Sequence, residues 1–312
     1  MKTVVITGAT SGIGLETAKL LARGGFRVIG IGRSAARCEQ AKQAVQLAQD
    51  GFPALGIGQN VARSGQSAQA IRAASPLSEP IFFTADLLQQ REVNRVAAEL
   101  TRFITAHCGG ELFALINNAG CARGYYMTTE DGYEHQFALN YLAGFLLTHR
   151  LLPLLKKAGG RVIMTGSRSH KGIRVHWNDV MLTRRYNPLT AYKQSKLCDI
   201  LFAKGLNDRY ASLGVSAYTV DPGLVRTDIG NKDAGGLVNL IWSVRKLGGV
   251  RPEIPAQTYA YLCSQPLPPA GLYYYHCRER ACSREVTSEN ANRLFALSER
   301  LCGITFGEEE RS

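Results

Sequence analysis

Residues 3–14 read Thr-Val-Val-Ile-Thr-Gly-Ala-Thr-Ser-Gly-Ile-Gly, and this stretch decides the fold. Its first five residues are β-branched and mostly apolar, which is typical of a strand buried on both faces. Three glycines follow, and the residues after Gly14 have the apolar spacing of a helix. A glycine turn between a strand and a helix lets the backbone approach a pyrophosphate, to which the helix N-terminus offers free N–H groups. The stretch therefore predicts a dinucleotide-binding unit, with the spacing GxxxGxG instead of the commoner GxGxxG.

The end of the next apolar run indicates which dinucleotide is bound. Residues 26–31 read Phe-Arg-Val-Ile-Gly-Ile and lead into Gly32 and Arg33. An acidic residue here would accept hydrogen bonds from the ribose 2′-hydroxyl of NAD, whereas an arginine can bind the 2′-phosphate of NADP. Arg33 therefore favours NADP(H), with Arg37 as a second candidate contact. The alternative is that Arg33 is only a surface residue at a strand end.

Predicted strands and helices alternate along the whole chain. We expect strands over 3–7, 26–31, 81–84, 112–116, 161–165, 215–220 and 271–275, and helices over 15–22, 35–49, 89–106, 132–155, 190–213 and 288–301. No linker divides them, so residues 1–312 are expected to form one α/β doubly wound Rossmann domain. Its central sheet would have seven mostly parallel strands, with helices on both faces.

Two segments depart from this alternation. Residues 51–80 are rich in Gly, Pro, Ser and Gln and predict a peripheral insertion, with one short helix around 67–73. Residues 224–255 combine Gly and Pro hinges with an apolar helix over 237–247, the composition of a mobile substrate lid.

Tyr192 and Lys196 stand four residues apart in Ala-Tyr-Lys-Gln-Ser-Lys, residues 191–196. On a helix they would share one face. The ordinary pKa of a phenol, about 10, is too high for ready proton exchange at neutral pH. A neighbouring ammonium favours the phenolate and lowers that pKa. Taken alone, the spacing is explained as well by a solvated helix face, so its meaning depends on the cofactor turn.

Polar and small residues follow several other predicted strands. Asp86 and Leu87 come after one strand, where the acid can accept a hydrogen bond from the adenine amino group. Residues 117–120, Asn-Asn-Ala-Gly, leave room for a cofactor and can connect neighbouring strands. Ser167 follows the next strand. Asn140 lies inside a predicted helix, where its propensity is unfavourable, which indicates another role for its side chain.

The composition indicates a globular protein with a basic surface. Hydrophobic residues make up 45% and charged residues 20% of the chain, and the net charge is +12. Its basic residues are scattered, so we expect no nucleic-acid partner; a phosphate-bearing cofactor or acidic lipid fits such a surface as well.

Eight cysteines without a CxxC pair predict free thiols, and no metal site is expected. We expect neither a signal peptide nor a membrane span, and hence a cytoplasmic protein.

The motifs and their order along the chain resemble those of the short-chain dehydrogenase/reductases, over nearly the whole chain. The matching motifs are residues 7–14, 86–87, 117–120, Asn140, Ser167, 192–196 and 222–223. The chain is most similar to the retinol dehydrogenase and protochlorophyllide reductase-like branch, on Gly32-Arg33, residues 140–148, residues 192–198 and the long separation of Ser167 from Tyr192. Three features depart from the branch and weaken the transfer of a substrate: the 51–80 insertion, Thr165-Gly166-Ser167 in place of paired serines, and Ala143 in place of a glycine.

The resemblance implies a role for each of four residues. Tyr192 would be the general acid in carbonyl reduction and the base in alcohol oxidation. Ser167 would hydrogen-bond the substrate oxygen, and Lys196 would bind the nicotinamide ribose and lower the pKa of Tyr192. Asn140 would hold a water that links Lys196 to solvent. The expected NADP(H)-binding residues are Gly8, Thr10, Ser11, Gly12, Ile13, Gly14, Arg33, Asp86, Leu87, Asn118, Ala119, Gly120, Tyr192, Lys196, Pro222, Gly223, Val225 and Thr227.

The leading functional hypothesis is an NADP(H)-dependent oxidoreductase that transfers hydride between the nicotinamide and a carbonyl or alcohol. Its substrate would be bulky and hydrophobic: a retinoid, a steroid or another lipophilic ketone or aldehyde. The alternatives are a tetrapyrrole C=C reductase and a non-catalytic NADP(H)-binding redox sensor. His170 and His176 are expected to face substrate or solvent and not to act as bases. A homo-oligomer formed through 132–156 and 190–213 is implied by the resemblance, and a weak membrane contact through the lid is an alternative use of the basic surface.

Overall fold

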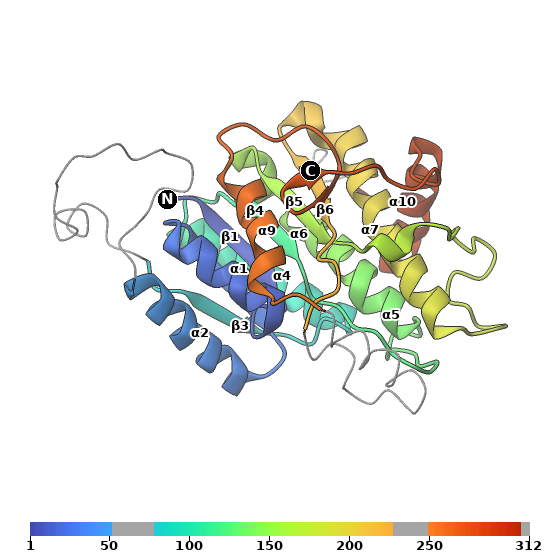
Figure 1. Ribbon diagram of the computed structural model, residues 1–312, viewed down its shortest axis with the longest axis horizontal. Coiled ribbons are helices and arrows are strands. Elements are labelled where there is room, and N and C mark those ends of the chain that lie inside the picture. The colour runs from blue at the N-terminus through green and yellow to red at the C-terminus, as the bar shows by residue number, and fades with distance from the viewer. Residues whose placement is uncertain (52–77, 227–248, 307–312) are drawn as a thin grey trace.

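An eight-stranded sheet runs through the centre of the protein in the order β3-β2-β1-β4-β5-β6-β7-β8 (Figure 1). The computed structural model describes residues 1–51, 78–226 and 249–306. Strands β1 to β7 pair in parallel and β8 pairs antiparallel with β7. The strands are β1 (Thr3–Thr7), β2 (Arg27–Gly32), β3 (Ile81–Thr84), β4 (Ala114–Asn117), β5 (Arg161–Thr165), β6 (Ser216–Val220), β7 (Tyr273–Tyr275) and β8 (Arg278–Glu279).

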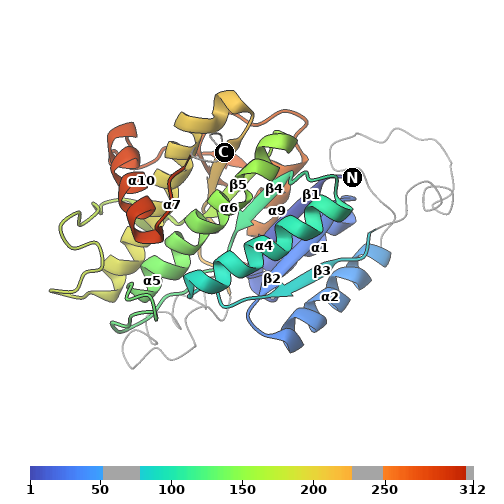
Figure 2. The same cartoon turned by 180° about the vertical axis from the view of Figure 1, so that it is seen from behind.

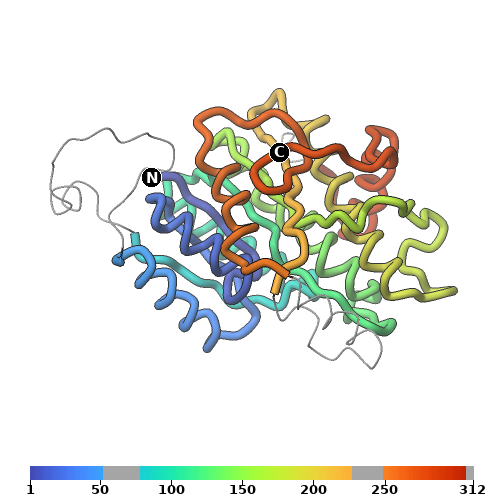
Figure 3. Tube along the Cα trace, in the orientation of Figure 1, coloured from blue at the N-terminus to red at the C-terminus, as the bar shows by residue number. Residues whose placement is uncertain are grey.

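Helices cover both faces of this sheet. Helices α1, α2 and α9 lie on the face toward the viewer in Figure 1, and α4, α6 and α7 lie on the face seen in Figure 2, with α10 packed on α7. Figure 3 shows α1 and α9 side by side, although they are far apart in the sequence. The α-helices are α1 (Gly12–Arg23), α2 (Ala35–Asp50), α4 (Gln90–His107), α5 (His135–Phe137), α6 (Ala143–Ala158), α7 (Pro188–Tyr210), α9 (Glu253–Ser264) and α10 (Ser288–Cys302), and shorter turns are the π-helix η1 (Ala138–Leu142) and the 3₁₀ helices η2 (Arg168–His170) and η3 (Ala211–Leu213).

An aromatic cluster fixes α7 against its neighbours on the second face. Phe145 of α6, Phe202 of α7 and Phe295 of α10 lie with ring centres 5.2–5.4 Å apart. Phe306 closes the cluster at 5.0 Å from Phe145. Aromatic pairs at such distances add to the stabilisation that burial of their surface provides. Helix α7 therefore has a rigid support for the side chains that it presents on its other side.

The elements α5, η1 and α6 form one long helical segment in the part of the chain where a helix over 132–155 is predicted. From His135 to Ala158 it is a continuous helix of 24 residues, long and apolar enough to cross a membrane by length and composition. Polar residues interrupt its apolar run, however, and 83% of its most apolar window is buried inside the protein. This is the position of a core helix, packed between the sheet and its neighbouring helices.

The predicted doubly wound α/β fold is confirmed, with two corrections. The sheet has eight strands and not seven, because a tight turn at His276 and Cys277 returns the chain as β8. Both turn residues have positive φ, 50° and 60°, which Gly or Asn would have signalled in the sequence. Helix α9 was missed, although Ala256, Tyr259, Ala260 and Cys263 have helical spacing and are buried.

Most of the predicted insertion and lid lies outside the described residues. This includes the short helix expected around 67–73 and the apolar helix expected over 237–247. Within the predicted lid, Val225 pairs with Val250 in a parallel bridge. Residues 253–255 are the first turn of α9, and the role of residues 224–255 as a substrate lid stays a prediction.

Candidate active site

The turn from β1 into α1 forms one wall of a cleft at the carboxyl edge of the sheet. Gly8 and Gly12 have φ values of 65° and 54°, a region that glycine adopts without steric cost. A Cβ on Gly14 would lie 2.4 Å from Gly8 O and 2.6 Å from Asn118 Nδ2, so a larger residue would force the turn away from β4. Helix α1 begins after Ser11 with no acidic residue in its first turn. Its N-terminus therefore suits a negatively charged group.

The cleft has a volume of about 970 Å³ and carries a strongly basic lining. Arg33 and Arg37 lie at its rim beyond the end of β2, both exposed, and Arg123 and Arg226 line it as well. Asp86 is the one acid among the described lining residues. The glycine turn and the arginines together suit the phosphate groups of a dinucleotide. Other predicted cofactor residues in the lining are Gly8, Thr10, Ser11, Gly12, Ile13, Leu87, Asn118, Ala119 and Gly120.

Thr7 and Asn118 connect the ends of β1 and β4 beneath this cleft. The Thr7 hydroxyl oxygen accepts the backbone N–H groups of Asn118 and Ala119, both at 2.9 Å. Asn118 Nδ2 in turn donates to Thr7 O at 3.1 Å. The prediction that residues 117–120 connect neighbouring strands is confirmed. These contacts hold the two strand ends at the point where the strand order reverses, which is where open α/β sheets bind their ligands.

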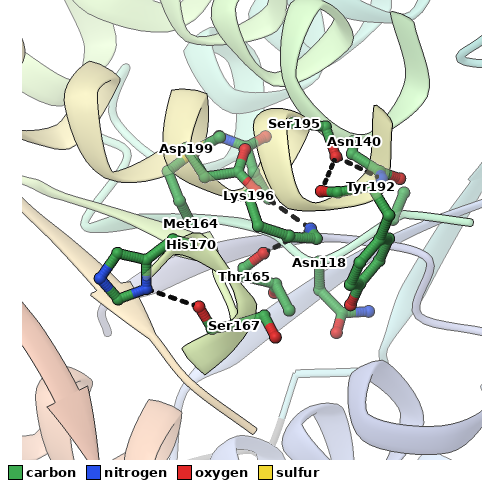
Figure 4. A network of polar contacts seen from close by, with 12 residues as sticks. Asn118, Asn140, Met164, Thr165, Ser167, His170, Tyr192, Ser195, Lys196 and Asp199 are labelled. Atoms are coloured by element: carbon green, nitrogen blue, oxygen red, sulfur yellow. Dashed lines mark hydrogen bonds and ion pairs between the residues drawn. The ribbon is translucent and has the colours of Figure 1, made fainter. Parts of the chain in front are cut away.

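Helix α7 presents Tyr192 and Lys196 toward the end of β5 (Figure 4). Lys196 Nζ lies 5.9 Å from the centre of the Tyr192 ring. It donates to Thr165 O at 2.7 Å and to Asp199 Oδ2 at 3.0 Å. The side chains of Lys196 and Asp199 are 6% and 0% exposed, so this ion pair is buried. One N–H of the ammonium remains beyond these two bonds.

Several opposing influences set the pKa of Tyr192. Burial raises it, whereas the Lys196 ammonium and a hydrogen bond with the Ser167 side chain lower it, and the net pKa is above its ordinary value. The expected influence of Lys196 is therefore present, but burial outweighs it. For Lys196, burial lowers the pKa, whereas the Asp199 carboxylate and Tyr192 raise it. Their combined effect is larger than that of burial, so the net pKa of Lys196 is raised. At neutral pH the pair is a phenol beside an ammonium.

Ser167 follows β5 and is held in place by its own loop. Its Oγ accepts the N–H of Ser169 at 3.2 Å. The ring of His170 donates from Nδ1 to Ser167 O at 2.7 Å, and its Nε2 accepts the N–H of Ser283 at 3.2 Å. His170 is completely buried, so the expectation that it faces substrate or solvent was wrong. Its neutral ring links the Ser167 loop to the distant segment at Ser283. His176 is exposed, as expected.

Asn140 lies in the π-helix η1, a distortion that is frequent at functional sites. Its Oδ1 accepts the N–H of Cys121 at 2.7 Å, and its Nδ2 donates to Cys121 O at 3.0 Å and to Ser195 Oγ at 2.9 Å. Ser195 Oγ donates to Tyr192 O at 2.8 Å. Both N–H groups of the amide are thus used within the protein. The side chain joins the end of the β4 loop to the backbone of the Tyr192 turn. Its Oδ1 has a second lone pair, so the expected role of Asn140 in holding a relay water stays a prediction.

The last predicted cofactor residues follow β6. Asp221 accepts the N–H of Gly223 at 2.9 Å through Oδ1 and the hydroxyl of Tyr273 at 2.7 Å through Oδ2. Gly223 has a φ of 69° and continues the chain past the sheet edge. Pro222, Gly223 and Val225 are not among the residues that line the cleft, nor are Gly14, Ser167, Tyr192 and Lys196. Thr227 lies outside the described residues.

Sequence reasoning missed two features of this site. Arg123 and Arg226 line the cleft, and each follows a motif that was identified, residues 117–120 and 222–223. Asp199 was also missed, although a signal was available. It stands three residues after Lys196 in an apolar stretch that is buried on all sides, and a carboxylate in such a stretch needs a cationic partner.

Comparisons with known proteins agree with this geometry. The family model described as short chain dehydrogenase matches residues 2–76 and 42–235. Human retinol dehydrogenase 13 is 33% identical over 97% of this chain and 85% of its own length. Human retinol dehydrogenase 14 is 35% identical over 97% of this chain and 87% of its own length.

A solved structure shows the same fold at lower sequence identity. The alcohol dehydrogenase of the archaeon Thermococcus sibiricus, complexed with 5-hydroxy-NADP, has a TM-score of 0.62 and 19% identity, covering 88% of this chain and 95% of that chain. With the family model and two relatives above 30% identity, this chain belongs to the short-chain dehydrogenase family and is an oxidoreductase of the nicotinamide-dependent kind.

Proposed function

We propose that this protein uses NADP(H) to interconvert a carbonyl and an alcohol on a bulky lipophilic substrate. The observation that carries the proposal is the convergence of Ser167, Tyr192 and Lys196 at the ends of β5 and α7, beside a basic dinucleotide cleft. These groups are a hydrogen-bond donor, a proton donor and a fixed cation. They are the parts that a carbonyl reduction needs around its developing alkoxide.

Each side chain has a distinct part in the proposed reaction. The bound cofactor supplies a hydride to the carbonyl carbon in the reductive direction. Tyr192 gives its phenolic proton to the carbonyl oxygen as negative charge develops there, so that no bare alkoxide forms in the dry site. Ser167 donates a hydrogen bond to the same oxygen. Lys196 stabilises the phenolate that remains on Tyr192, and its remaining N–H is available to the nicotinamide ribose.

The choice of NADP(H) is supported by the arginines at the adenosine end of the cleft. Arg33 and Arg37 project into solvent at its rim, where a guanidinium can bind a 2′-phosphate through two parallel hydrogen bonds. The Thermococcus structure, which has the same fold, is complexed with an NADP derivative.

A lipophilic substrate is supported by exposed apolar residues in the chain segment before Tyr192 and in contact with that segment. Leu189, one turn before Tyr192, is 46% exposed. Tyr126 is also exposed, and its ring lies 5.2 Å from that of Tyr186, three residues before Leu189. The relatives that match over almost the whole chain are retinol dehydrogenases. A retinoid aldehyde or alcohol is therefore the first substrate to test.

The proposed function is tested by following NADPH absorbance with a panel of carbonyl compounds. We expect consumption of NADPH with all-trans-retinal or a steroid ketone, little with acetone, and none in the Tyr192→Phe variant. Binding of NADPH without turnover of any compound would favour a redox sensor. A tetrapyrrole product with a reduced C=C bond would favour the alternative reductase.

The cofactor preference provides a separate prediction. Arg33→Asp should weaken NADPH binding by about 100-fold, about 3 kcal/mol, because it removes charge-assisted hydrogen bonds and adds a repulsive carboxylate. NADH binding should be unchanged or improved. Isothermal titration with both cofactors measures the ratio of the two dissociation constants, and Arg102→Asp, an exposed arginine of α4 that does not line the cleft, is the control. An unchanged ratio would show that Arg33 does not read the phosphate.

A further inference from the structure

Asp199 is a buried carboxylate that lies directly behind the Tyr192–Lys196 pair. It is one turn further along α7, and its Oδ2 lies 3.0 Å from Lys196 Nζ (Figure 4). Its side chain is fully buried. Its Oδ1 is buried as well and has no hydrogen-bond partner within residues 1–51, 78–226 and 249–306.

Stability does not account for a carboxylate in this place. The neighbouring positions on the chain are Leu197, Cys198, Ile200 and Leu201, all completely buried. Replacing a buried ion pair by apolar residues of similar volume is often neutral or stabilising. A carboxylate oxygen without a partner adds a further penalty. The charge of Asp199 is therefore to be explained by what it does to Lys196 and, through Lys196, to Tyr192.

The contacts of Lys196 define that effect. Its ammonium is held between Asp199 Oδ2 and Thr165 O, which points it along the end of β5 and fixes its position relative to the Tyr192 ring. A positive charge beside a phenol favours the phenolate, and a negative charge behind that positive charge reduces this influence. The ammonium is thus kept in place while the effect of its charge on Tyr192 is partly offset.

Few other ionisable groups face this arrangement from the surrounding elements. Lys196, Tyr192 and Cys198 share α7 with Asp199. From other elements the facing groups are Tyr141 of η1, Tyr259 of α9, Asp221 after β6 and Cys121 after β4. Burial raises the pKa of the Tyr141, Cys198, Tyr259 and Cys121 groups, so all four are neutral near pH 7. Burial raises the pKa of Asp199 to about 7 although Lys196 opposes this rise. In the alkaline range where Tyr192 titrates, the described charges near it are therefore Lys196, Asp199 and Asp221.

We propose that Asp199 is a positioning residue that clamps Lys196 and offsets its charge, so that Tyr192 remains a phenol and the site is set to deliver a proton to a carbonyl oxygen. The direction of each influence agrees: burial and Asp199 raise the pKa of Tyr192, whereas Lys196 lowers it. In the reductive direction Tyr192 must be protonated, so Asp199 extends reduction to higher pH. In the oxidative direction Tyr192 must be a phenolate, so Asp199 displaces oxidation to more alkaline conditions. Only this choice of direction rests on the proposed function.

The test is a titration of Tyr192 that needs no substrate. The chain is labelled with ¹³Cζ-tyrosine, and the Tyr192 signal is identified by its loss in Tyr192→Phe. Asp199→Asn keeps the shape and the hydrogen bond to Lys196 but removes the charge. We expect the Tyr192 titration midpoint to fall by about one pH unit in Asp199→Asn and to stay at the parent value in Asp208→Asn. Asp208 is the matched control, since it pairs with Lys204 on the same helix but at its surface.

A midpoint that is unchanged in Asp199→Asn, or that falls equally in Asp208→Asn, would overturn the proposal. If Asp199→Asn does not fold, Asp199→Ser removes the same charge in a smaller side chain and is judged by the same outcome. With an active substrate, the pH at which kcat/KM for reduction declines should fall together with the NMR midpoint. A protein that reduces none of the carbonyl panel would contradict the proposed function, while the titration would still decide the role of Asp199.

Discussion

Replacing Tyr192 by phenylalanine is expected to lower kcat by about 10²–10⁴-fold, which is the contribution of a positioned general acid, while leaving the affinity for NADPH within about threefold of the parent. The substitution removes one oxygen atom and keeps the ring. The Tyr192 phenol is the group that Ser167 and Lys196 hold in position. The cleft lining, by contrast, comprises the glycine turn and the arginines and does not include Tyr192, so cofactor binding should persist.

Single-turnover absorbance measurements give the rate of hydride transfer, and fluorescence titration gives the NADPH dissociation constant. Tyr133→Phe is the matched control, because the hydroxyl of Tyr133 is also hydrogen-bonded, donating to Leu301 O at 2.6 Å. That contact lies at the end of α10, away from Ser167, Tyr192 and Lys196. That variant should keep its rate within a few fold. Activity of Tyr192→Phe close to that of the parent would remove the tyrosine from the proposed mechanism.

The fold could be predicted from sequence because its determining features are local. The strand at Thr3–Thr7, the glycine turn and the following helix are specified by adjacent residues, and each repetition of strand and helix adds a parallel strand. The site residues could be placed as well, because the carboxyl ends of parallel strands meet at one edge. For this reason Ser167 after β5 and Asn118 after β4 both lie in the candidate active site.

The remaining features depend on contacts that join distant segments. His170 binds Ser283, 113 residues away, and nothing in the local pattern distinguishes a buried, bonded histidine from an exposed one. The extra strand depends on a turn whose φ values are unusual for His276 and Cys277. The role of the Asn140 side chain likewise depends on Cys121 and Ser195, which come from two other segments.

The second large effect is expected when Lys196 is changed to methionine, because Asp199 then loses its cation. Breaking a buried ion pair at one partner costs about 3–5 kcal/mol, and turnover should fall at least about 100-fold with it. Burial raises the pKa of Asp199, and Lys196 opposes that rise. Without Lys196 the folded-state pKa would be higher still. A carboxyl with a raised pKa in the folded state loses stability as pH rises from its unfolded value, about 4, through its folded value, so the cost should be larger at pH 8 than at pH 5.

The double variant Lys196→Met with Asp199→Leu separates the ion pair from catalysis. With both charges removed the buried site is apolar, and the free energy of unfolding should return to within about 1 kcal/mol of the parent, while turnover stays low because no cation remains beside Tyr192. Urea unfolding at pH 5 and pH 8 measures these differences.

Lys204→Met, which breaks the surface pair with Asp208 on the same helix, should cost less than about 1 kcal/mol. A Lys196→Met variant as stable as Lys204→Met, or a double variant whose cost is the sum of its single changes, would show that Lys196 and Asp199 do not act as a pair. Recovery of stability without recovery of turnover would assign the pair to catalysis instead of folding.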